Sequence, residues 1–245
     1  MPENLFLPCS ALDSDRNGVL RQLLLENEEQ DNGGDHREHD GTHHGVRVHG
    51  LLGTEHEQTI HWMLADKNQS LVLEQTKTGL SLHRNDVGVL TNNPHFDVHM
   101  YHLSNYMSVS CEEPENKFSS KIHLEAHSRG MGGLGLPGDL SSMSRFVKAS
   151  FTKLNSDFGQ TEQEAVHQFF HVLYSVYQQK GCVKVGDAFE ITNYSSCCNT
   201  CKGIYYYTTY YNSTIRAVDM FKENLDDAKL ICYDMAQNDV FCLQN

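Results

Sequence analysis

The sequence is poor in basic residues and in long apolar runs, and each shortage excludes a class of partner. Its 245 residues include 19 Lys and Arg against 32 Asp and Glu, which gives a formal net charge of −13. Nucleic-acid backbones and anionic membrane surfaces are bound through clustered Lys and Arg, so this composition argues against both. No apolar run approaches the roughly 20 residues that a membrane-spanning helix needs. We therefore expect neither nucleic acid nor a membrane as partner.

Two further shortages concern the cellular compartment. Eight cysteines in 245 residues are far fewer than a disulfide-stabilised scaffold contains. The start Met1-Pro2-Glu3-Asn4 shows no basic stretch followed by an apolar one, so no secretory signal is expected. Without export, cysteines remain in a reducing environment. The sequence therefore predicts a cytoplasmic protein with free thiols.

The composition changes near residue 60. Residues 1–60 hold 12 acidic and 4 basic side chains, and six histidines lie between His36 and His56. The run 26–41 has no apolar residue, so burial cannot offset the entropy lost on ordering it. We predict that residues 1–60 are a disordered, polar and His-rich segment in which only a short helix over 17–28 could form. Residues 61–245 are predicted to be the folded domain.

Residues 61–245 contain both strand-like and helical patterns. Short apolar runs between polar turns predict an antiparallel meander with strands over 61–66, 70–74, 79–83 and 87–91. Apolar residues at helical spacing predict a helix over 143–154, after Gly138-Asp139, and another over 161–177, which begins with a capping box. Further strands are predicted over 189–194, 203–211, 215–220 and 229–233. This order of strands, helices and strands predicts an α+β layered domain.

Histidine and cysteine clusters form two candidate metal sites. His36, His39, His43 and His44 could ligate a metal, but a structural zinc site needs four ligands fixed by a fold, so a solvated polar tract is favoured. The segment 197–201 contains one Cys-x-x-Cys without the second pair that zinc requires. Because strand-like residues follow it, we interpret it as a hairpin connection and expect neither a metal nor a cofactor.

Three other features could serve a reaction. The glycine-rich segment 129–139 lacks the Lys and Ser or Thr that end a phosphate-binding loop, so a tightly folded surface loop is expected. Asn92, within Thr91-Asn92-Asn93-Pro94, could donate its amide to a developing oxyanion, although turn chemistry also explains it. Arg145 lies early in an apolar helix, where a snorkelling surface side chain is the simpler interpretation. Taken alone, these residues assign no function.

Residues 61–245 resemble the choloylglycine hydrolase family, which comprises bile salt hydrolases and penicillin V acylases. The longest matching stretch is 128–146, Ser-Arg-Gly-Met-Gly-Gly-Leu-Gly-Leu-Pro-Gly-Asp-Leu-Ser-Ser-Met-Ser-Arg-Phe. The other matching stretches are His61-Trp62 with 65–67, 88–94, 103–106, 151–156, 195–198 and 203–207. Within the family, these stretches are most similar to the bile salt hydrolase type.

The resemblance implies an incomplete four-layer αββα sandwich of the N-terminal-nucleophile hydrolase type, without its first strands. It also implies hydrolysis of the C–N amide bond that joins a bile acid to glycine or taurine, so conjugated bile salts are the expected partners. Asn92 matches the family's oxyanion-hole asparagine, and Arg145 matches the arginine near the nucleophile, where it would favour the thiolate. The family suggests a homotetramer, an assembly that is not expected of this chain.

Residues 1–60 depart from the family pattern. The family nucleophile is a cysteine directly after the initiator Met, with its own α-amine as base, whereas this sequence has Pro2. The Arg-Asn-x-Asp element and the second oxyanion-hole asparagine also have no counterpart, so we predict an inactive chain. Three alternatives stay open: a non-catalytic homologue that binds bile acids or joins an oligomer, an enzyme that uses Cys9 after loss of residues 1–8, and a penicillin V acylase-like amidase.

Overall fold

A computed structural model describes residues 61–66, 68–76, 79–239 and 241–244. The predictions for residues 1–60, including the helix over 17–28, the histidines and Cys9, lie outside the described residues. The helices are α2 (Phe96–Leu103), α3 (Ser142–Leu154) and α4 (Glu162–Tyr174), with 3-10 turns at Ser104–Tyr106, Met131–Gly133 and Met220–Lys222. The strands are β1 (His61–Ala65), β2 (Ser70–Thr76), β3 (Gly79–Arg84), β4 (Lys184–Val185), β5 (Ala188–Phe189), β6 (Tyr194–Asn199), β7 (Ile204–Thr209) and β8 (Asn212–Asp219). None of the described helices is long and apolar enough to cross a membrane.

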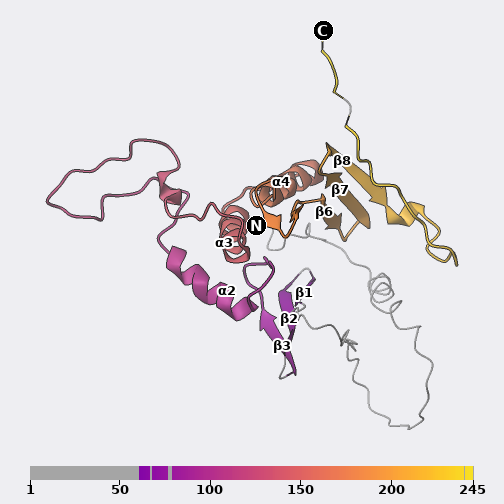
Figure 1. Ribbon diagram of the computed structural model, residues 1–245, viewed down its shortest axis with the longest axis horizontal. Helices are drawn as coiled ribbons and strands as arrows, with labels where there is room; N and C mark the ends of the chain where they lie inside the picture. Colours follow the sequence, from indigo (N-terminus) through magenta and orange to yellow (C-terminus); the bar gives the residue numbers. More distant parts are fainter. Residues whose placement is uncertain (1–60, 67, 77–78, 240, 245) are drawn as a thin grey trace. The chain divides into compact units, whose positions relative to one another are not determined.

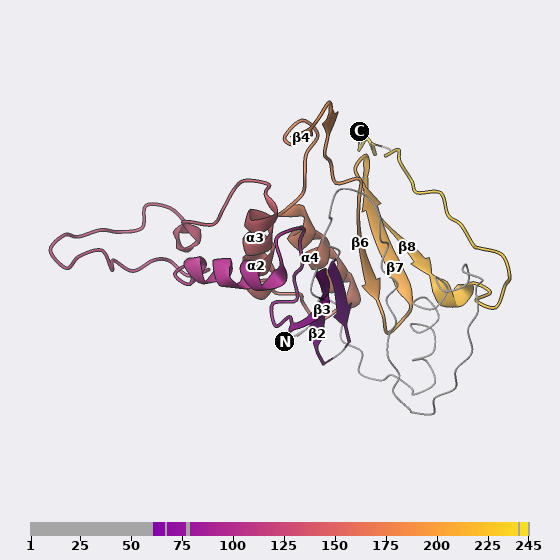
Figure 2. The same cartoon turned by 60° about the horizontal axis from the view of Figure 1, so that its bottom comes forward.

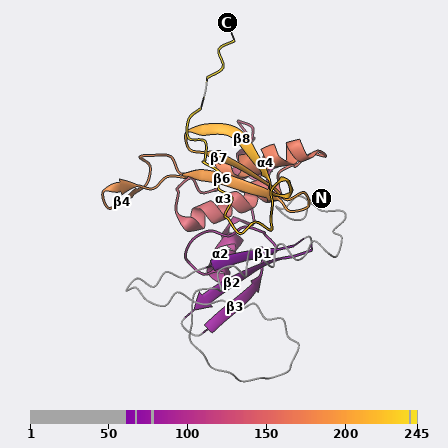
Figure 3. The same cartoon turned by 90° about the vertical axis from the view of Figure 1, so that its right-hand side faces the viewer.

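The first three strands form an antiparallel sheet in the order β1–β2–β3, seen in Figure 3. Met63 lies opposite Val72, and Val72 lies opposite His83, so these side chains share one face of the sheet. On that face Val72 is fully buried in a cluster with Phe96 of α2 and Phe146 of α3. The predicted meander is thus confirmed for its first three strands, and two helices pack on one side of it.

The fourth predicted strand, over 87–91, is wrong because this segment is irregular. Side chains satisfy its backbone in place of a neighbouring strand. Asn85 Oδ1 accepts from the Gly88 N–H at 2.7 Å, and Lys153 Nζ donates to the Val87 carbonyl at 2.7 Å. Gly88 has φ of 63°, which glycine adopts without strain. The apolar side chains of Val89 and Leu90, which led to the strand prediction, pack instead against the core beneath the sheet.

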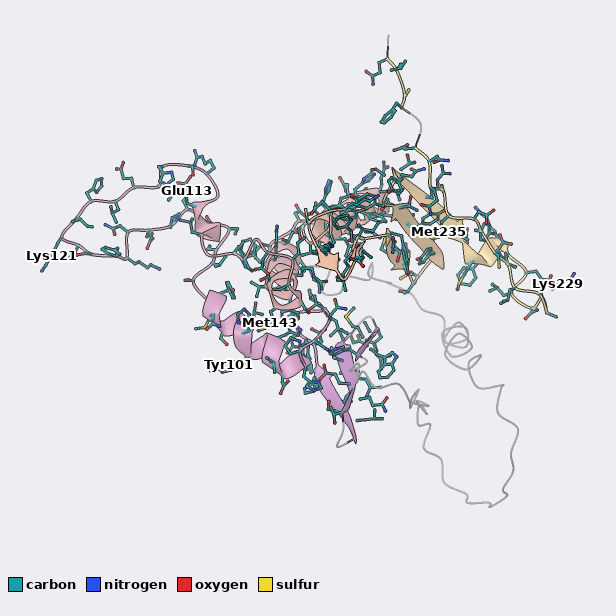
Figure 4. The ribbon with its side chains drawn as sticks, viewed as in Figure 1. Tyr101, Glu113, Lys121, Met143, Lys229 and Met235 are labelled. Atoms are coloured by element: carbon teal, nitrogen blue, oxygen red, sulfur yellow. The ribbon has the colours of Figure 1, made fainter. Side chains whose placement is uncertain are left out.

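Helix α2 has no counterpart among the helices predicted from the sequence. Phe96 and His99 on one face are buried, whereas Tyr101 is 82% exposed and can be located by its label in Figure 4. Its N-cap, His95, makes no side-chain capping bond. A helix of eight residues without a capping signal offers little for a sequence pattern to detect.

Helix α3 confirms the first predicted helix and begins at Ser142. Its N-cap is Ser141, whose Oγ accepts from the Ser144 N–H. Asp139 strengthens this end, because its carboxylate accepts from the Ser141 N–H at 2.9 Å and from the Ser144 hydroxyl at 2.5 Å. These hydrogen bonds lower the pKa of Asp139 to about 2. The capped start fixes the first turn of α3, which carries Arg145.

Helix α4 begins with the predicted capping box of Thr161 and Glu164 and ends earlier than residue 177. It packs on a second antiparallel sheet of order β6–β7–β8. Val166 and Phe170 of α4 form a buried cluster there with Cys197 of β6. Figure 1 shows α4 beside this sheet, and Figure 2 shows its three strands side by side. The described chain therefore contains two three-stranded sheets, one packed against α2 and α3 and the other against α4.

Two of the later predicted strands are wrong. Residues 189–194 hold only the last residue of β5 and the first of β6, and those between are irregular. Residues 229–233 are irregular as well, and Leu230 is 90% exposed. Strand propensity reflects packing against neighbouring strands, and 229–233 joins none of the described sheets. The strands predicted over 203–211 and 215–220 are confirmed as β7 and β8, with shifted ends.

Candidate functional site

The structure brings the two singled-out residues, Asn92 and Arg145, into contact. Asn92 lies in the loop between β3 and α2, and Arg145 lies at the start of α3. Arg145 Nη2 donates to Asn92 Oδ1 at 2.6 Å. Because the guanidinium can only donate, it identifies the amide oxygen and directs Asn92 Nδ2 elsewhere. Asn92 is exposed, and no group in the described part of the chain accepts from its Nδ2, which leaves a fixed donor facing solvent.

The backbone of Asn92 is held as well. Ser142 Oγ donates to the Asn92 carbonyl at 2.7 Å, and His99 Nε2 lies 2.9 Å from the same oxygen. A carbonyl only accepts, so His99 carries a proton on Nε2. The His99 ring stacks on Phe146 with centroids 4.8 Å apart, and burial lowers the pKa of His99. A neutral imidazole with a defined tautomer therefore ties α2 to Asn92.

Arg145 is half-buried and held by a second hydrogen bond. Its Nε donates to the Leu140 carbonyl at 3.1 Å. Burial lowers the pKa of the guanidinium, while the nearby Glu190 carboxylate favours its charged form. Arginine keeps its proton in such surroundings. A fixed cation beside an exposed amide donor suits an oxyanion or a thiolate.

A buried carboxylate lies behind the loop that carries Asn92. Glu74 of β2 is 1% exposed, and its Oε1 accepts from the Phe96 N–H at 2.9 Å. The same oxygen lies 2.6 Å from His61 Nδ1, and His61 Nε2 lies 3.2 Å from Asn93 Oδ1. Hydrogen bonds therefore run from the sheet to the residue next to Asn92.

Two more histidines approach the other oxygen of Glu74. His95 Nδ1 lies 3.4 Å and His83 Nε2 lies 3.6 Å from Oε2. Over the residues that the structure describes, no group of three or more His, Cys, Asp or Glu has the geometry to hold a metal ion. The Glu74 carboxylate instead forms hydrogen bonds with the His61 ring and the Phe96 N–H, and the rings of His83 and His95 lie within ion-pair distance of it.

The Cys-x-x-Cys segment joins β6 to β7 as the predicted hairpin connection. Cys198 lies on β6, and Cys201 lies in the turn that follows. Burial raises the pKa of Cys197 to about 12 and also raises the pKa of Cys198. A thiol with a raised pKa holds little thiolate at neutral pH. Neither Cys197 nor Cys198 is therefore an activated thiol.

The glycine-rich segment 129–139 is a tightly folded loop, as predicted. A Cβ on Gly132 would lie 2.0 Å from the Glu112 carbonyl oxygen, and the Gly132 carbonyl accepts from the Ser110 N–H at 2.9 Å. Gly130 has φ of 78°. Close backbone packing and a left-handed conformation account for these glycines. The loop leads directly to the capped start of α3.

The family model for linear amide C–N hydrolases, choloylglycine hydrolase family, matches residues 49–233, a range that includes Asn92, Arg145 and Glu74. The chain belongs to the choloylglycine hydrolase family. Within this family, it is 56% identical over 177 residues to a bile salt hydrolase/transferase of Lactiplantibacillus plantarum. It is 39% identical over 178 residues to a bile salt hydrolase/transferase of Clostridium perfringens. The matches cover 72% and 71% of this chain but 55% and 54% of those proteins, so the chain spans about half the length of the curated relatives it matches.

Two solved structures show the same fold. A variant of the conjugated bile acid hydrolase from Clostridium perfringens matches with a TM-score of 0.66 and 38% identity, over 76% of this chain and 57% of that one. Penicillin V acylase from Agrobacterium tumefaciens matches with a TM-score of 0.51 and 20% identity, over 66% and 45%, a likeness of fold alone. These matches confirm the α+β class and the partial αββα sandwich of the N-terminal-nucleophile hydrolase type.

Sequence reasoning missed Glu74, His61, His99 and Ser142. Glu74 had a readable signal, because it shares strand parity with Val72 and so falls on the inward face. A carboxylate at an inward position requires partners. His99 could not be assigned without α2, and His61 only becomes informative once β1 is paired with β2.

Proposed function

We propose that Asn92 and Arg145 belong to the active site of a bile salt hydrolase, which cleaves the amide bond between a bile acid and glycine or taurine. The observation that carries this proposal is the 2.6 Å hydrogen bond from Arg145 Nη2 to Asn92 Oδ1. That bond leaves Asn92 Nδ2 as an exposed, oriented donor, which is what a polarised carbonyl oxygen requires. The family and the two bile salt hydrolase relatives support amide hydrolysis as the reaction.

In this mechanism a thiolate adds to the carbonyl carbon of the substrate amide. The carbonyl oxygen becomes an oxyanion that accepts from Asn92 Nδ2. The α-amine of the nucleophilic cysteine, which took the thiol proton, gives that proton to the amide nitrogen as the C–N bond breaks, so glycine or taurine leaves as the amine. Water then hydrolyses the thioester, which releases the bile acid and regenerates the thiol. Arg145 orients the Asn92 amide through Oδ1, and its positive charge lowers the pKa of a thiol placed beside it.

The nucleophile in this proposal is the N-terminal cysteine that the family resemblance implies, and position 2 here is Pro2. Cys197, which is buried, and Cys198, which is exposed, both have raised pKa values and do not replace it. We expect the 245-residue chain to bind conjugated bile salts at Asn92 and Arg145. A cytoplasmic location stays a prediction from the sequence. The penicillin V acylase likeness concerns the fold, so bile salts are the proposed substrates.

Calorimetric titration of the full 245-residue chain with glycocholate tests this proposal, together with an assay for released glycine. Asn92→Ala should weaken glycocholate binding roughly three- to tenfold, the loss of one hydrogen bond. Asn155→Ala is the matched control, because Asn155 is also exposed and its amide donates only within α3, to Phe151. No binding by the wild-type chain would refute the proposed substrate. Glycine release that Cys9→Ala abolishes would refute the expected inactivity.

A further inference from the structure

Glu74 is a buried carboxylate in the first sheet, on the same face as the apolar Val72 and Met63. Its side chain is 1% exposed, and Val72, two residues earlier, is fully buried on the same face. Removing a carboxylate from water is costly unless hydrogen bonds replace its hydration. The replacements come from His61 of β1 and from the Phe96 N–H at the start of α2, where the loop carrying Asn92 ends.

Glu74 and α3 hold this loop, residues 91–96, at its two ends. At the first end, Ser142 and Arg145 bind the carbonyl and the amide oxygen of Asn92. At the second end, the Phe96 N–H donates to Glu74 Oε1 at 2.9 Å. If only one end were held, the other end of the loop could still move. Both sets of hydrogen bonds are therefore needed to define its conformation.

His61 connects Glu74 to Asn93, the residue beside Asn92. Because Oε1 already accepts from the Phe96 N–H, it is an acceptor, and His61 Nδ1 donates to it at 2.6 Å. The other ring nitrogen, Nε2, lies 3.2 Å from Asn93 Oδ1. The His61 ring is thus fixed by the carboxylate on one side and contacts the loop on the other.

We propose that Glu74 is a positioning residue for Asn92. Through His61 and the Phe96 N–H, it fixes the second end of the loop, so that the Asn92 amide keeps the direction in which it meets the substrate carbonyl. The role of Asn92 toward bile salts rests on the proposed function, whereas the fixing of its side chain by Glu74 does not. Glu74 acts through other residues and touches no reacting atom.

The second sheet provides a matched control. Glu162, at the start of α4, accepts from Lys202 Nζ at 2.6 Å, from Tyr206 Oη at 2.9 Å and from Asn199 Nδ2. It joins α4 to the β6–β7 hairpin and makes no hydrogen bond with residues 91–96 among those described. Glu162→Gln therefore makes the same chemical change as Glu74→Gln without a route to Asn92.

The test is NMR spectroscopy of the ¹⁵N-labelled full chain as wild type, Glu74→Gln and Glu162→Gln. In Glu74→Gln we expect the Asn92 side-chain amide resonances to shift or broaden and the Phe96 amide to exchange about tenfold faster, the effect of losing one charged acceptor. Glu162→Gln should leave both unchanged. Glycocholate affinity should fall about tenfold in Glu74→Gln alone, by the same conversion.

A folded Glu74→Gln variant with wild-type Asn92 resonances would overturn the proposal. If Glu74→Gln does not fold, His61→Gln decides, because it keeps the bond from Phe96 to Glu74 and removes the contact with Asn93. Altered Asn92 resonances in His61→Gln support the proposal, and unaltered ones overturn it. A wild-type chain that binds no glycocholate would defeat the proposed function, while the resonances would still decide the positioning role.

Discussion

Two regions of the chain place helices against a three-stranded antiparallel sheet, and each uses one carboxylate to connect helix and sheet. In residues 61–154, Glu74 of the sheet binds the start of α2 and is 1% exposed. In residues 161–219, Glu162 at the start of α4 binds the hairpin between β6 and β7, and its side chain is 28% exposed. The partners of Glu74 are histidines and a backbone N–H, whereas those of Glu162 are Lys202, Tyr206 and Asn199.

The difference in burial between Glu74 and Glu162 corresponds to the segment that each carboxylate holds in place. Glu162 stabilises a turn whose side chains have no assigned reaction, and a partly exposed ion pair of this kind contributes little to stability. Glu74 stabilises the loop that presents Asn92, and deep burial makes its hydrogen bonds costly to lose. The buried arrangement is the one that a fixed donor requires, because a site must be held by side chains that are themselves fixed.

The largest expected effect comes from the core of each region. Phe146→Ala and Phe170→Ala each remove a side chain that is at most 1% exposed and should each lower the free energy of unfolding by about 3–5 kcal/mol. Phe146 also stacks on His99, which holds Asn92. Urea unfolding measures the first effect, and glycocholate titration of the folded variants measures the second.

Only Phe146→Ala should weaken glycocholate binding. Phe170→Ala serves as its control, since it belongs to the core under the second sheet. Equal loss of binding in both variants would show that general destabilisation explains the effect. The contrast between the two regions would then have no functional meaning.

A pH-dependent effect should occur in the first region, at Lys153. Burial lowers the pKa of Lys153 to about 8 from 10.5, so the unfolded chain binds more protons between these pH values. The free energy of unfolding therefore rises with pH through this window. Relative to Lys153→Met, wild-type stability should increase by about 2–3 kcal/mol from pH 7 to pH 10. Urea unfolding of both proteins at each pH measures the difference, and parallel pH profiles would contradict the shift.

The smallest expected difference between the two regions comes from the N-caps of their helices. Thr161→Ala and Ser141→Ala remove the N-caps of α4 and α3, and each should cost about 1 kcal/mol of stability. Ser141→Ala should also reduce glycocholate binding, because the first turn of α3 carries Ser142 and Arg145. Thermal unfolding and titration measure the two effects. Reduced binding in Thr161→Ala would contradict the assignment of the site to the first region.

Local sequence patterns predicted the two long capped helices and most strands of the two three-stranded sheets, but neither the short helix α2 nor the irregular segments. Helices α3 and α4 follow from apolar periodicity and a capping box, which act within a few residues. The segment 87–91 and helix α2 do not follow, because Lys153 and Glu74, distant in sequence, satisfy their backbone groups. Asn92 and Arg145 were found through family resemblance, and their contact spans 53 positions that no local pattern connects.

The role of Asn92 is tested most directly by its side-chain amide resonances during a glycocholate titration of the ¹⁵N-labelled full chain. If Asn92 Nδ2 meets the substrate carbonyl, its resonances shift saturably with the same dissociation constant that calorimetry gives, while those of Asn155 stay in place. Saturable glycocholate binding that leaves the Asn92 amide unchanged would contradict the proposed site.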